Sequence, residues 1–371
     1  MLGERLKFAR EAAGLRQSDV AQALNLSPSG VSDFEDDTST REPKASQLAI
    51  LARLYHRTVE FFLQDGPLVG DFVLWRCKPA DEANALDIQR RFFGLCEDYR
   101  DLEELTGETH SEALPVDETP MARFSYSQAE ALAARAGQEL AIGPAPAEVL
   151  RHVLEERFRV KVFALPLGAA ASSLCAISDS FGPAVLLNQD SVSWRRNYDL
   201  AHELFHLLTW RTFGHSGSSQ EADQQEEKWA SCFASCLLLP EAPFRSKIKQ
   251  FIDANDGLKM TFADLNGIAR AFDVSTEAVV YRLAGLFRWR KEQSQEIVGK
   301  LREFYAPRQS ASIDALPKRY VYLVAQAYRQ GLLSFGKAVK LLRASRKDAE
   351  AVLEPPDDRV DLNSTIEVAA G

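Results

Sequence analysis

Apolar residues recur at helical spacing along most of the chain, which predicts a mostly helical protein with a few short strands. Residues 1–66 predict a compact set of short helices, in which Ser27-Pro28 marks a helix start. Residues 67–125 predict a short strand at 72–75 and then one long helix at about 81–105. We assign no chemistry to this second segment and interpret it as a connection.

Helical and strand patterns alternate in the central part of the chain, residues 126–290. Helices are expected near 127–140 and 146–156, strands at 160–165, 174–178 and 184–188, and further helices at 194–210, 227–240, 262–271 and 276–286. Residues 291–353 predict two or three more helices, and the acidic residues 354–371 predict a disordered tail. The sequence therefore predicts an α+β fold that is mostly α, with an all-α N-terminal domain, a small central β-sheet and a C-terminal helical region.

Composition limits the classes of function. The chain has 44 basic and 53 acidic residues and a net charge of −9, so any contact with DNA must be local. Its 5 cysteines include no CxxC pair, which argues against a disulfide framework and for a reducing compartment. No apolar run reaches the ~18 residues of a membrane helix, and the charged N-terminus does not resemble a signal peptide. We therefore expect a cytoplasmic protein that does not enter a membrane.

The segment His202-Glu203-Leu204-Phe205-His206 has the HExxH spacing and lies in a predicted helix. Residues i and i+4 share one helix face, so both imidazoles can bind one zinc ion (Zn2+) at about 2.0–2.1 Å. Glu203 can then act as general base toward a zinc-bound water, whose pKa falls to about 7. Chance gives about 0.01 such matches in a chain of this composition. The alternative is a buried helix whose histidines bond only neighbouring residues.

A third protein ligand is expected from the helix that follows. Its candidates are Glu221, Asp223, Glu226 and Glu227. Glu227 begins the apolar face of a helix that ends at Pro240, and this face is expected to pack against the HExxH helix. We therefore select Glu227. Glu226 lies about 100° around the helix and is expected at a solvated helix start.

The two motifs RRNYDLAHELFHLLTW and EKWASCFASCLLLP resemble the ImmA/IrrE family of zinc metallopeptidases. The resemblance covers roughly residues 126–290 and implies a zincin-like metallopeptidase domain. Carried over residue by residue, it implies His202, His206 and Glu227 as zinc ligands and Glu203 as catalytic base. Characterised members of the family cleave a partner repressor and so control genes of stress responses or mobile elements.

Several residues near these motifs leave alternatives open. Phe205 and Trp229 replace residues that are common in the family, and we expect them to affect packing and contacts around the ligands. Asp199 could hydrogen-bond a ligand or only cap locally, and His215 could stabilise an oxyanion or belong to an exposed loop. Two further residues, Cys232 and Cys236, are one turn apart near the site, and their apolar background favours a packing role over metal binding.

Residues 1–66 resemble the helix-turn-helix domain of phage repressors (XRE type), on the stretches LRQSDVAQALNLSPSGVSDFEDD and LAILARLYHRTVEFFL. In such domains the third helix enters the major groove of DNA. The resemblance implies that Gln17 braces a phosphate. It implies base contacts for Pro28, Ser29, Gly30, Ser32 and Asp33, and phosphate contacts for Arg16, Arg41 and Lys44.

The charge of this segment weakens the DNA-binding interpretation. Residues 1–66 carry a net charge of −2, and the expected recognition helix lacks the Arg, Lys, Asn and Gln side chains that form the best base contacts. A module of the same fold that binds protein or forms a homodimer is the alternative.

The favoured interpretation is a zinc endopeptidase fused to a helix-turn-helix domain, with a protein substrate such as a repressor. A second interpretation is a DNA-binding transcription regulator whose peptidase-like domain senses a metal or a ligand and hydrolyses little. A third is one partner of a toxin–antitoxin or phage-defence pair.

Overall fold

The computed structural model describes most of the chain, in two compact units. The described residues are 2–13, 15–55, 59–63, 72–76, 79–168, 171–214, 220–221, 224–254, 260–304 and 313–353. One unit comprises residues 1–99 and 110–317, and the other comprises residues 100–109 and 318–371.

The first five helices enclose their own hydrophobic core. They are α1 (Leu2–Ala12), α2 (Gln17–Leu24), α3 (Pro28–Phe34), α4 (Ala45–Leu54) and α5 (Val59–Leu63). Leu6, Val20, Val31 and Leu51 lie in this core and are almost fully buried. The turn between α2 and α3 is tight, because Asn25 adopts a left-handed conformation with φ 57° and Ser27 caps α3.

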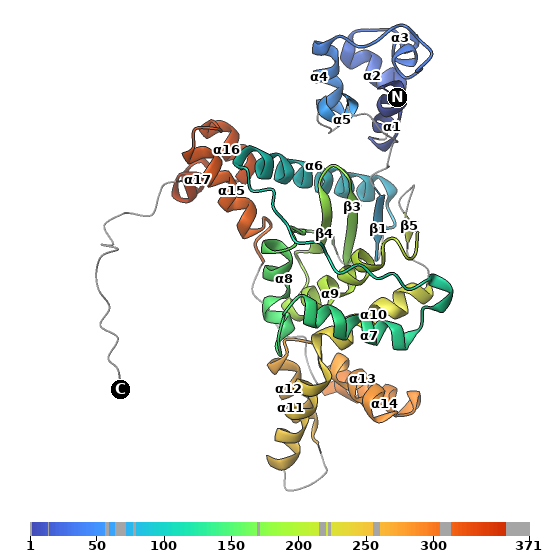
Figure 1. Ribbon diagram of the computed structural model, residues 1–371, viewed down its shortest axis with the longest axis vertical. Coiled ribbons are helices and arrows are strands. Elements are labelled where there is room, and N and C mark those ends of the chain that lie inside the picture. The colour runs from blue at the N-terminus through green and yellow to red at the C-terminus, as the bar shows by residue number, and fades with distance from the viewer. Residues whose placement is uncertain are drawn as a thin grey trace, which may run out of the picture. The chain divides into compact units, whose positions relative to one another are not determined.

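A five-stranded mixed sheet forms the centre of the larger unit (Figure 1). Its order is β2 (Lys161–Leu165), β4 (Gly182–Asn188), β3 (Ser173–Ser178), β1 (Phe72–Trp75) and β5 (Gln220–Glu221). Strand β4 runs parallel to β2 and antiparallel to β3, and β1 pairs antiparallel with β3. Segment 72–75 is therefore part of the sheet, and it aligns Trp75 with Leu174.

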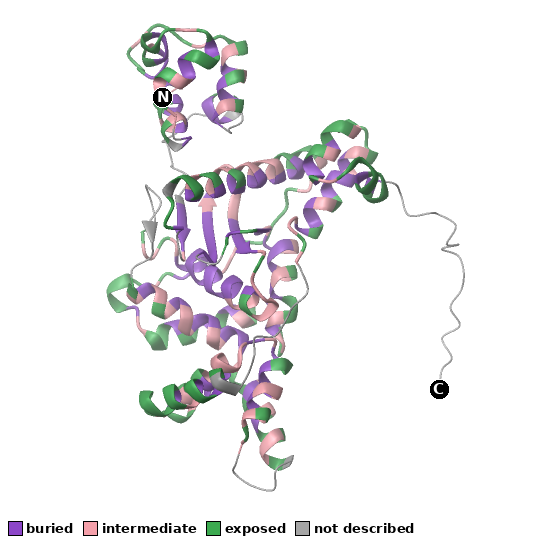
Figure 2. Cartoon of the chain, turned by 180° about the vertical axis from the view of Figure 1, so that it is seen from behind, coloured by how far each residue is buried: buried purple, intermediate pink, exposed green. Residues whose placement is uncertain are grey.

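Both faces of the sheet are covered, and most residues of β2, β3 and β4 are buried (Figure 2). On one face, Phe92 of α6 (Glu82–Thr106) packs edge-on against Phe163 of β2. On the other face, α9 (Ser193–Thr209) contacts β3 and β4. Val162 and Val185 join the core that also holds α9.

The helices on the α9 side pack on one another. They are the 3-10 turn η1 (Met121–Arg123), α7 (Tyr126–Glu139), α8 (Pro146–Glu156), α10 (Gln224–Leu238), α11 (Glu241–Ala254), α12 (Phe262–Ala271), α13 (Thr276–Phe287) and α14 (Lys291–Phe304). Helix α10 packs against both α7 and α9. Val298 and Leu301 place α14 in this same core. Sequence patterns missed α11, whose apolar positions are interrupted by charged residues.

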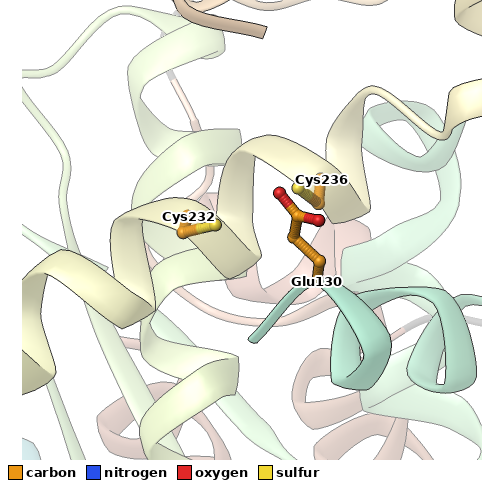
Figure 3. Close-up of side chains that lie close together, drawn as sticks. All are labelled: Glu130, Cys232 and Cys236. Carbon is orange, nitrogen blue, oxygen red and sulfur yellow. The ribbon is translucent and has the colours of Figure 1, made fainter. Parts of the chain in front are cut away.

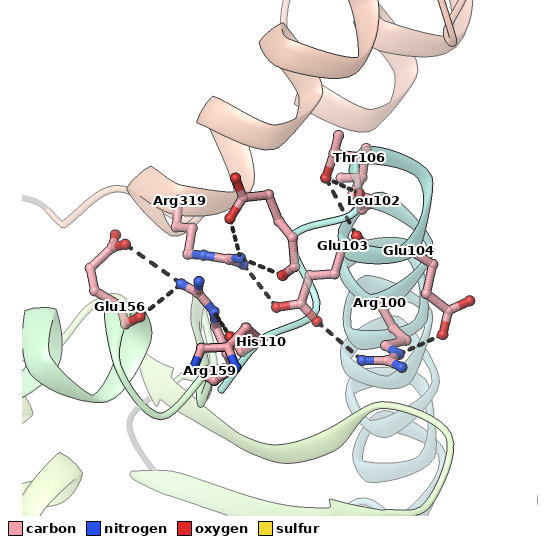
Figure 4. A network of polar contacts seen from close by, with 10 residues as sticks. Arg100, Leu102, Glu103, Glu104, Thr106, His110, Glu156, Arg159 and Arg319 are labelled. Carbon is pink, nitrogen blue, oxygen red and sulfur yellow. Dashed lines mark hydrogen bonds and ion pairs between the residues drawn. The ribbon is translucent and has the colours of Figure 1, made fainter. Parts of the chain in front are cut away.

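The smaller unit contains α15 (Lys318–Arg329), α16 (Phe335–Leu342) and α17 (Arg346–Leu353), together with the end of α6. A buried ion pair joins α15 to the end of α6. Arg319 Nη1 donates to Glu103 Oε1 at 2.8 Å (Figure 4). Nη2 of Arg319 also donates to the carbonyl of Glu108 at 2.9 Å. Two hydrogen bonds from one guanidinium are typical of buried arginine pairs.

The predicted fold class is confirmed, because the described chain is mostly helical with one small sheet. Among the described residues no helix is long and apolar enough to cross a membrane. The predicted tail at 354–371 and His215 lie outside the described residues.

Candidate metal centre

Helix α9 presents the HExxH residues from inside the protein. His202, Glu203 and His206 are at most 1% exposed. The imidazole rings of His202 and His206 lie on one face, with their centroids 5.2 Å apart. Burial lowers the pKa of His202 to about 3, so this imidazole is neutral at pH 7 and can act as a metal ligand.

Glu227 on α10 brings a carboxylate to both histidines. Its Oε2 lies 3.1 Å from His202 Nε2, and its Oε1 lies 3.4 Å from His206 Nε2. One ligand atom from each of these three residues lies within 4.8 Å of the others. Within the described part of the chain, the buried Nε2 of His202 has the Glu227 carboxylate nearby but makes no well-aligned hydrogen bond. Two imidazoles and one carboxylate that converge in this way fit a zinc ion with an open fourth position.

Glu226 is placed differently from the sequence-based expectation. It is 4% exposed rather than solvated, and its Oε1 lies 2.8 Å from Nδ1 of His206. The expectation was wrong because α10 begins at Gln224, so Glu226 already lies within the helix and against α9. With Nδ1 held by Glu226, the Nε2 atom of His206 is the one that faces Glu227. A carboxylate in this position orients the imidazole and increases its basicity.

Glu203 lies between α9 and the sheet. Its Oε1 accepts a hydrogen bond of 2.6 Å from the Ser173 hydroxyl on β3. Its Oε2 is buried and has no hydrogen-bond partner among the described residues. Burial raises the pKa of Glu203 above the ordinary value of a glutamate. One oxygen is therefore fixed while the other remains available for proton transfer.

Asp199 forms an ion pair with Arg76, the residue that directly follows β1. The carboxylate of Asp199 is buried, and Arg76 also stacks on the Tyr198 ring with its guanidinium carbon 5.3 Å from the ring centroid. Neither alternative considered for Asp199 described this contact. Arg76 belongs to the segment predicted as a connection and supplies the charge that balances Asp199, a contact that the sequence pattern did not indicate.

Two parts of the chain match known family models. Residues 155–284 match the family model described as IrrE N-terminal-like domain, and residues 1–60 match one described as Helix-turn-helix domain. The chain combines a helix-turn-helix domain with an IrrE-like domain. This is the combination that the two sequence resemblances imply.

Two individual proteins are also similar to parts of the chain. The HTH-type transcriptional regulator ImmR of Bacillus subtilis (strain 168) is 37% identical over 62 residues, which are 17% of this chain and 47% of that relative. The match thus spans about half the length of the curated relative. A solved Mycobacterium tuberculosis transcriptional regulator is 18% identical with a TM-score of 0.30, covering 51% of this chain and 52% of that chain.

Phe205 and Trp229 both lie in a cluster of aromatic side chains. Phe205 is fully buried and packs against Phe124 and Phe233, with ring centroids 5.7 Å and 5.6 Å away. Trp229 stacks on Phe213, with centroids 5.8 Å apart and ring planes 22° apart. Phe205 also contacts the His206 ring, with centroids 5.5 Å apart, so it packs beside a predicted ligand.

A cavity of about 680 Å³ adjoins the candidate centre of the IrrE-like domain. Glu227 and Tyr198 contribute to its wall, as do Cys232 and Cys236 of α10 and Tyr281 of α13. A volume of this size accommodates a small ligand or a few side chains of a peptide.

The helix-turn-helix domain exposes only part of its predicted DNA-contact set. Pro28, Ser29 and Ser32 are exposed on α3, and Arg16 and Lys44 are exposed at the starts of α2 and α4. Gly30 is buried instead, because the close approach of the Arg41 guanidinium covers it.

Three other predicted DNA contacts have partners within the helix-turn-helix domain. Arg41 Nη1 donates to Asp33 Oδ2 at 3.1 Å, so these two predicted contacts bond each other. Gln17 Nε2 donates to Glu35 Oε2 at 2.9 Å, and Glu35 also pairs with Arg10. The domain boundaries and the roles of these residues stay predictions.

Proposed function

We propose that this chain is a zinc-dependent endopeptidase whose substrate is a protein, namely a repressor. The observation that supports this most is the convergence of His202, His206 and Glu227 beside Glu203. The three candidate ligands and the buried Glu203 carboxylate lie together, and Glu227 also lines a cavity. The reaction would take place in the cytosol, where a repressor and its operator are found.

Each residue of the site has a defined task in this proposal. A bound zinc ion would polarise the scissile carbonyl and acidify a coordinated water. Ser173 holds Oε1 of Glu203, which leaves Oε2 to accept a proton and to deliver it to the leaving amine. The raised pKa of Glu203 suits this exchange, because a carboxyl that titrates closer to neutral pH both takes and releases a proton.

The helix-turn-helix domain would supply the second half of the function. It would bring the enzyme to a promoter, or it would recruit a repressor by pairing with a related domain. Arg41 is paired with Asp33, which reduces the positive charge that α3 offers to DNA and favours recruitment through protein contacts.

Cleavage is best tested with the products of neighbouring genes. Each product is incubated with the full chain, with and without zinc, and intact masses are compared for the wild type and Glu203→Gln. We expect fragments only with the wild type and zinc, whereas His202→Ala should lose both zinc and cleavage. The control Glu241→Gln changes an exposed glutamate of α11 and should cleave normally.

The same experiment separates the proposal from the sensor interpretation. A sensor would bind its operator in a zinc-dependent manner and leave every neighbouring product intact. Undiminished cleavage by Glu203→Gln would show that the assigned base is wrong.

A further inference from the structure

Helix α10 carries two thiols beyond the candidate zinc site. Cys232 and Cys236 are one helical turn apart and lie on the same side of the helix. Both are half-buried, and both line the 680 Å³ cavity that also contains Glu227. The two thiols therefore face an open cavity and are not enclosed in the apolar core.

Glu130 of α7 completes a cluster with these thiols. Figure 3 shows its carboxylate pointing from α7 toward the two cysteine side chains of α10. One carboxylate oxygen and the two sulfur atoms all lie within 4.8 Å of one another. Glu130 is exposed, so its carboxylate can adjust its position at little cost.

Arg282 of α13 provides a fixed positive charge at this cluster. Its Nη1 lies 3.0 Å from Cys236 Sγ, and its Nε donates to the carbonyl of Leu239 at 3.1 Å. A hydrogen bond from Cys232 and the charge of Arg282 lower the pKa of Cys236. The guanidinium thus favours the thiolate form, which is the form that binds metals.

Charge and geometry together indicate what the cluster binds. With both cysteines deprotonated, two thiolates, one carboxylate and one guanidinium sum to a charge of −2, which a divalent cation neutralises. The hydrogen bond with Cys236 and burial raise the pKa of Cys232, so an incoming metal would displace a proton from this thiol. A disulfide fits poorly, because Cβ atoms at i and i+4 of a helix are about 5–6 Å apart and a disulfide requires about 3.5–4.5 Å. A metal–sulfur bond of about 2.3 Å on each side bridges the longer span.

We infer that Cys232, Cys236 and Glu130 form a second metal site, which binds a thiophilic divalent cation such as Zn2+ or Cd2+. Three protein ligands leave a fourth position toward the cavity. Arg282 would act on the metal through the sulfur of Cys236, as a positioning residue rather than a ligand.

Occupancy of this site would also affect the peptidase, a consequence that rests on the proposed function. The cluster shares its cavity with Glu227, so a cation and its water would occupy space that a peptide needs. Excess zinc would then inhibit cleavage by the wild type and spare Cys232→Ser/Cys236→Ser.

The site is tested by titrating Cd2+ into the metal-free full chain under a non-thiol reductant. We expect two equivalents in the wild type, with thiolate-to-metal charge-transfer absorption in the ultraviolet. His202→Ala/His206→Ala should keep the absorption and lose one equivalent. Cys232→Ser/Cys236→Ser should lose the absorption and keep one equivalent, while its other three cysteines report any nonspecific thiolate binding.

A second variant tests the arginine. Arg282→Gln should weaken Cd2+ binding at the thiolate site about 10–100-fold, with unchanged circular dichroism. The inference fails if the wild type and Cys232→Ser/Cys236→Ser show equal stoichiometry and equal absorption. This result is independent of peptidase activity, so failure of the proposed function would not be mistaken for failure of the second site.

Discussion

Glu226 Oε1 lies 2.8 Å from Nδ1 of His206, and both side chains are almost completely buried. This contact fixes the imidazole so that Nε2 faces the carboxylate of Glu227. Such carboxylate–histidine pairs increase the affinity of metal sites although the carboxylate never touches the metal.

We therefore expect Glu226→Gln to weaken zinc binding by about 10–100-fold, because a neutral amide polarises His206 less than a carboxylate does. Competition with a chromophoric chelator measures the affinity. Glu296→Gln, an equal change at an exposed position of α14, should leave the affinity unchanged. Equal affinity of Glu226→Gln and the wild type would mean that Glu226 only fills space.

The protonation state of His206 predicts a pH dependence of metal binding. Burial opposes its charge, but hydrogen bonds to Glu226 and Glu227 outweigh burial and raise its pKa to about 9 in the metal-free chain. His206 is then protonated at pH 7, and an incoming metal must displace this proton. Metal affinity should rise with pH up to about 9.

Calorimetry in buffers of different ionisation enthalpy measures this proton directly. We expect release of about one proton per metal at pH 7, and clearly less in Glu226→Gln. Because the folded pKa lies above the ordinary 6.5, protonated His206 stabilises the metal-free fold fully below pH 6.5 and ceases to do so as the pH rises through 9. Binding without proton release would contradict the assignment.

Local periodicity predicts that the three candidate ligands converge, whereas the groups that orient them depend on tertiary contacts. His202 and His206 share a helix face by their spacing alone, and Glu227 followed from the apolar face of α10. Ser173 contacts Glu203 across 30 residues, and Arg76 contacts Asp199 across 123 residues. No periodicity encodes such pairs.

One of the missed contacts left a trace in the sequence. Glu226 and Glu227 are consecutive, so their carboxylates lie on two different faces of helix α10. Glu226 is buried as well, because α10 begins before it. Helix α10 begins at Gln224 rather than at Glu227, and this difference decides the burial of Glu226.

The hydrogen bond from Ser173 predicts a positioning role in catalysis. Ser173→Ala should lower kcat by about tenfold or more, since hydrogen bonds to charged groups contribute about 1.5–3 kcal/mol. Zinc affinity should not change, because Ser173 touches none of the ligands. Ser178→Ala, a control on the same strand, should keep full activity. A loss of zinc from Ser173→Ala would indicate damage to the fold instead.

The Arg76–Asp199 pair predicts a strong effect on stability. Arg76→Leu leaves the buried carboxylate of Asp199 with only the more distant Arg195, whose Nε lies 4.0 Å away, and should destabilise the fold by about 3–5 kcal/mol. The double variant Arg76→Leu/Asp199→Leu removes both charges and should recover most of this loss. Chemical denaturation of the four proteins of this double-mutant cycle measures the coupling. Additive effects of the two substitutions would refute it.

The Asp33–Arg41 pair predicts how DNA affinity depends on charge in the helix-turn-helix domain. Asp33→Asn removes an acid from α3 and frees Arg41 for a phosphate, so the full chain should bind a mixed-sequence duplex several-fold more tightly. Arg41→Ala should weaken binding and reduce the salt slope by about 1. Fluorescence anisotropy at several salt concentrations measures both quantities, and Arg346→Ala is a control at an exposed arginine of α17. If neither Asp33→Asn nor Arg41→Ala changes the affinity, α3 does not face DNA.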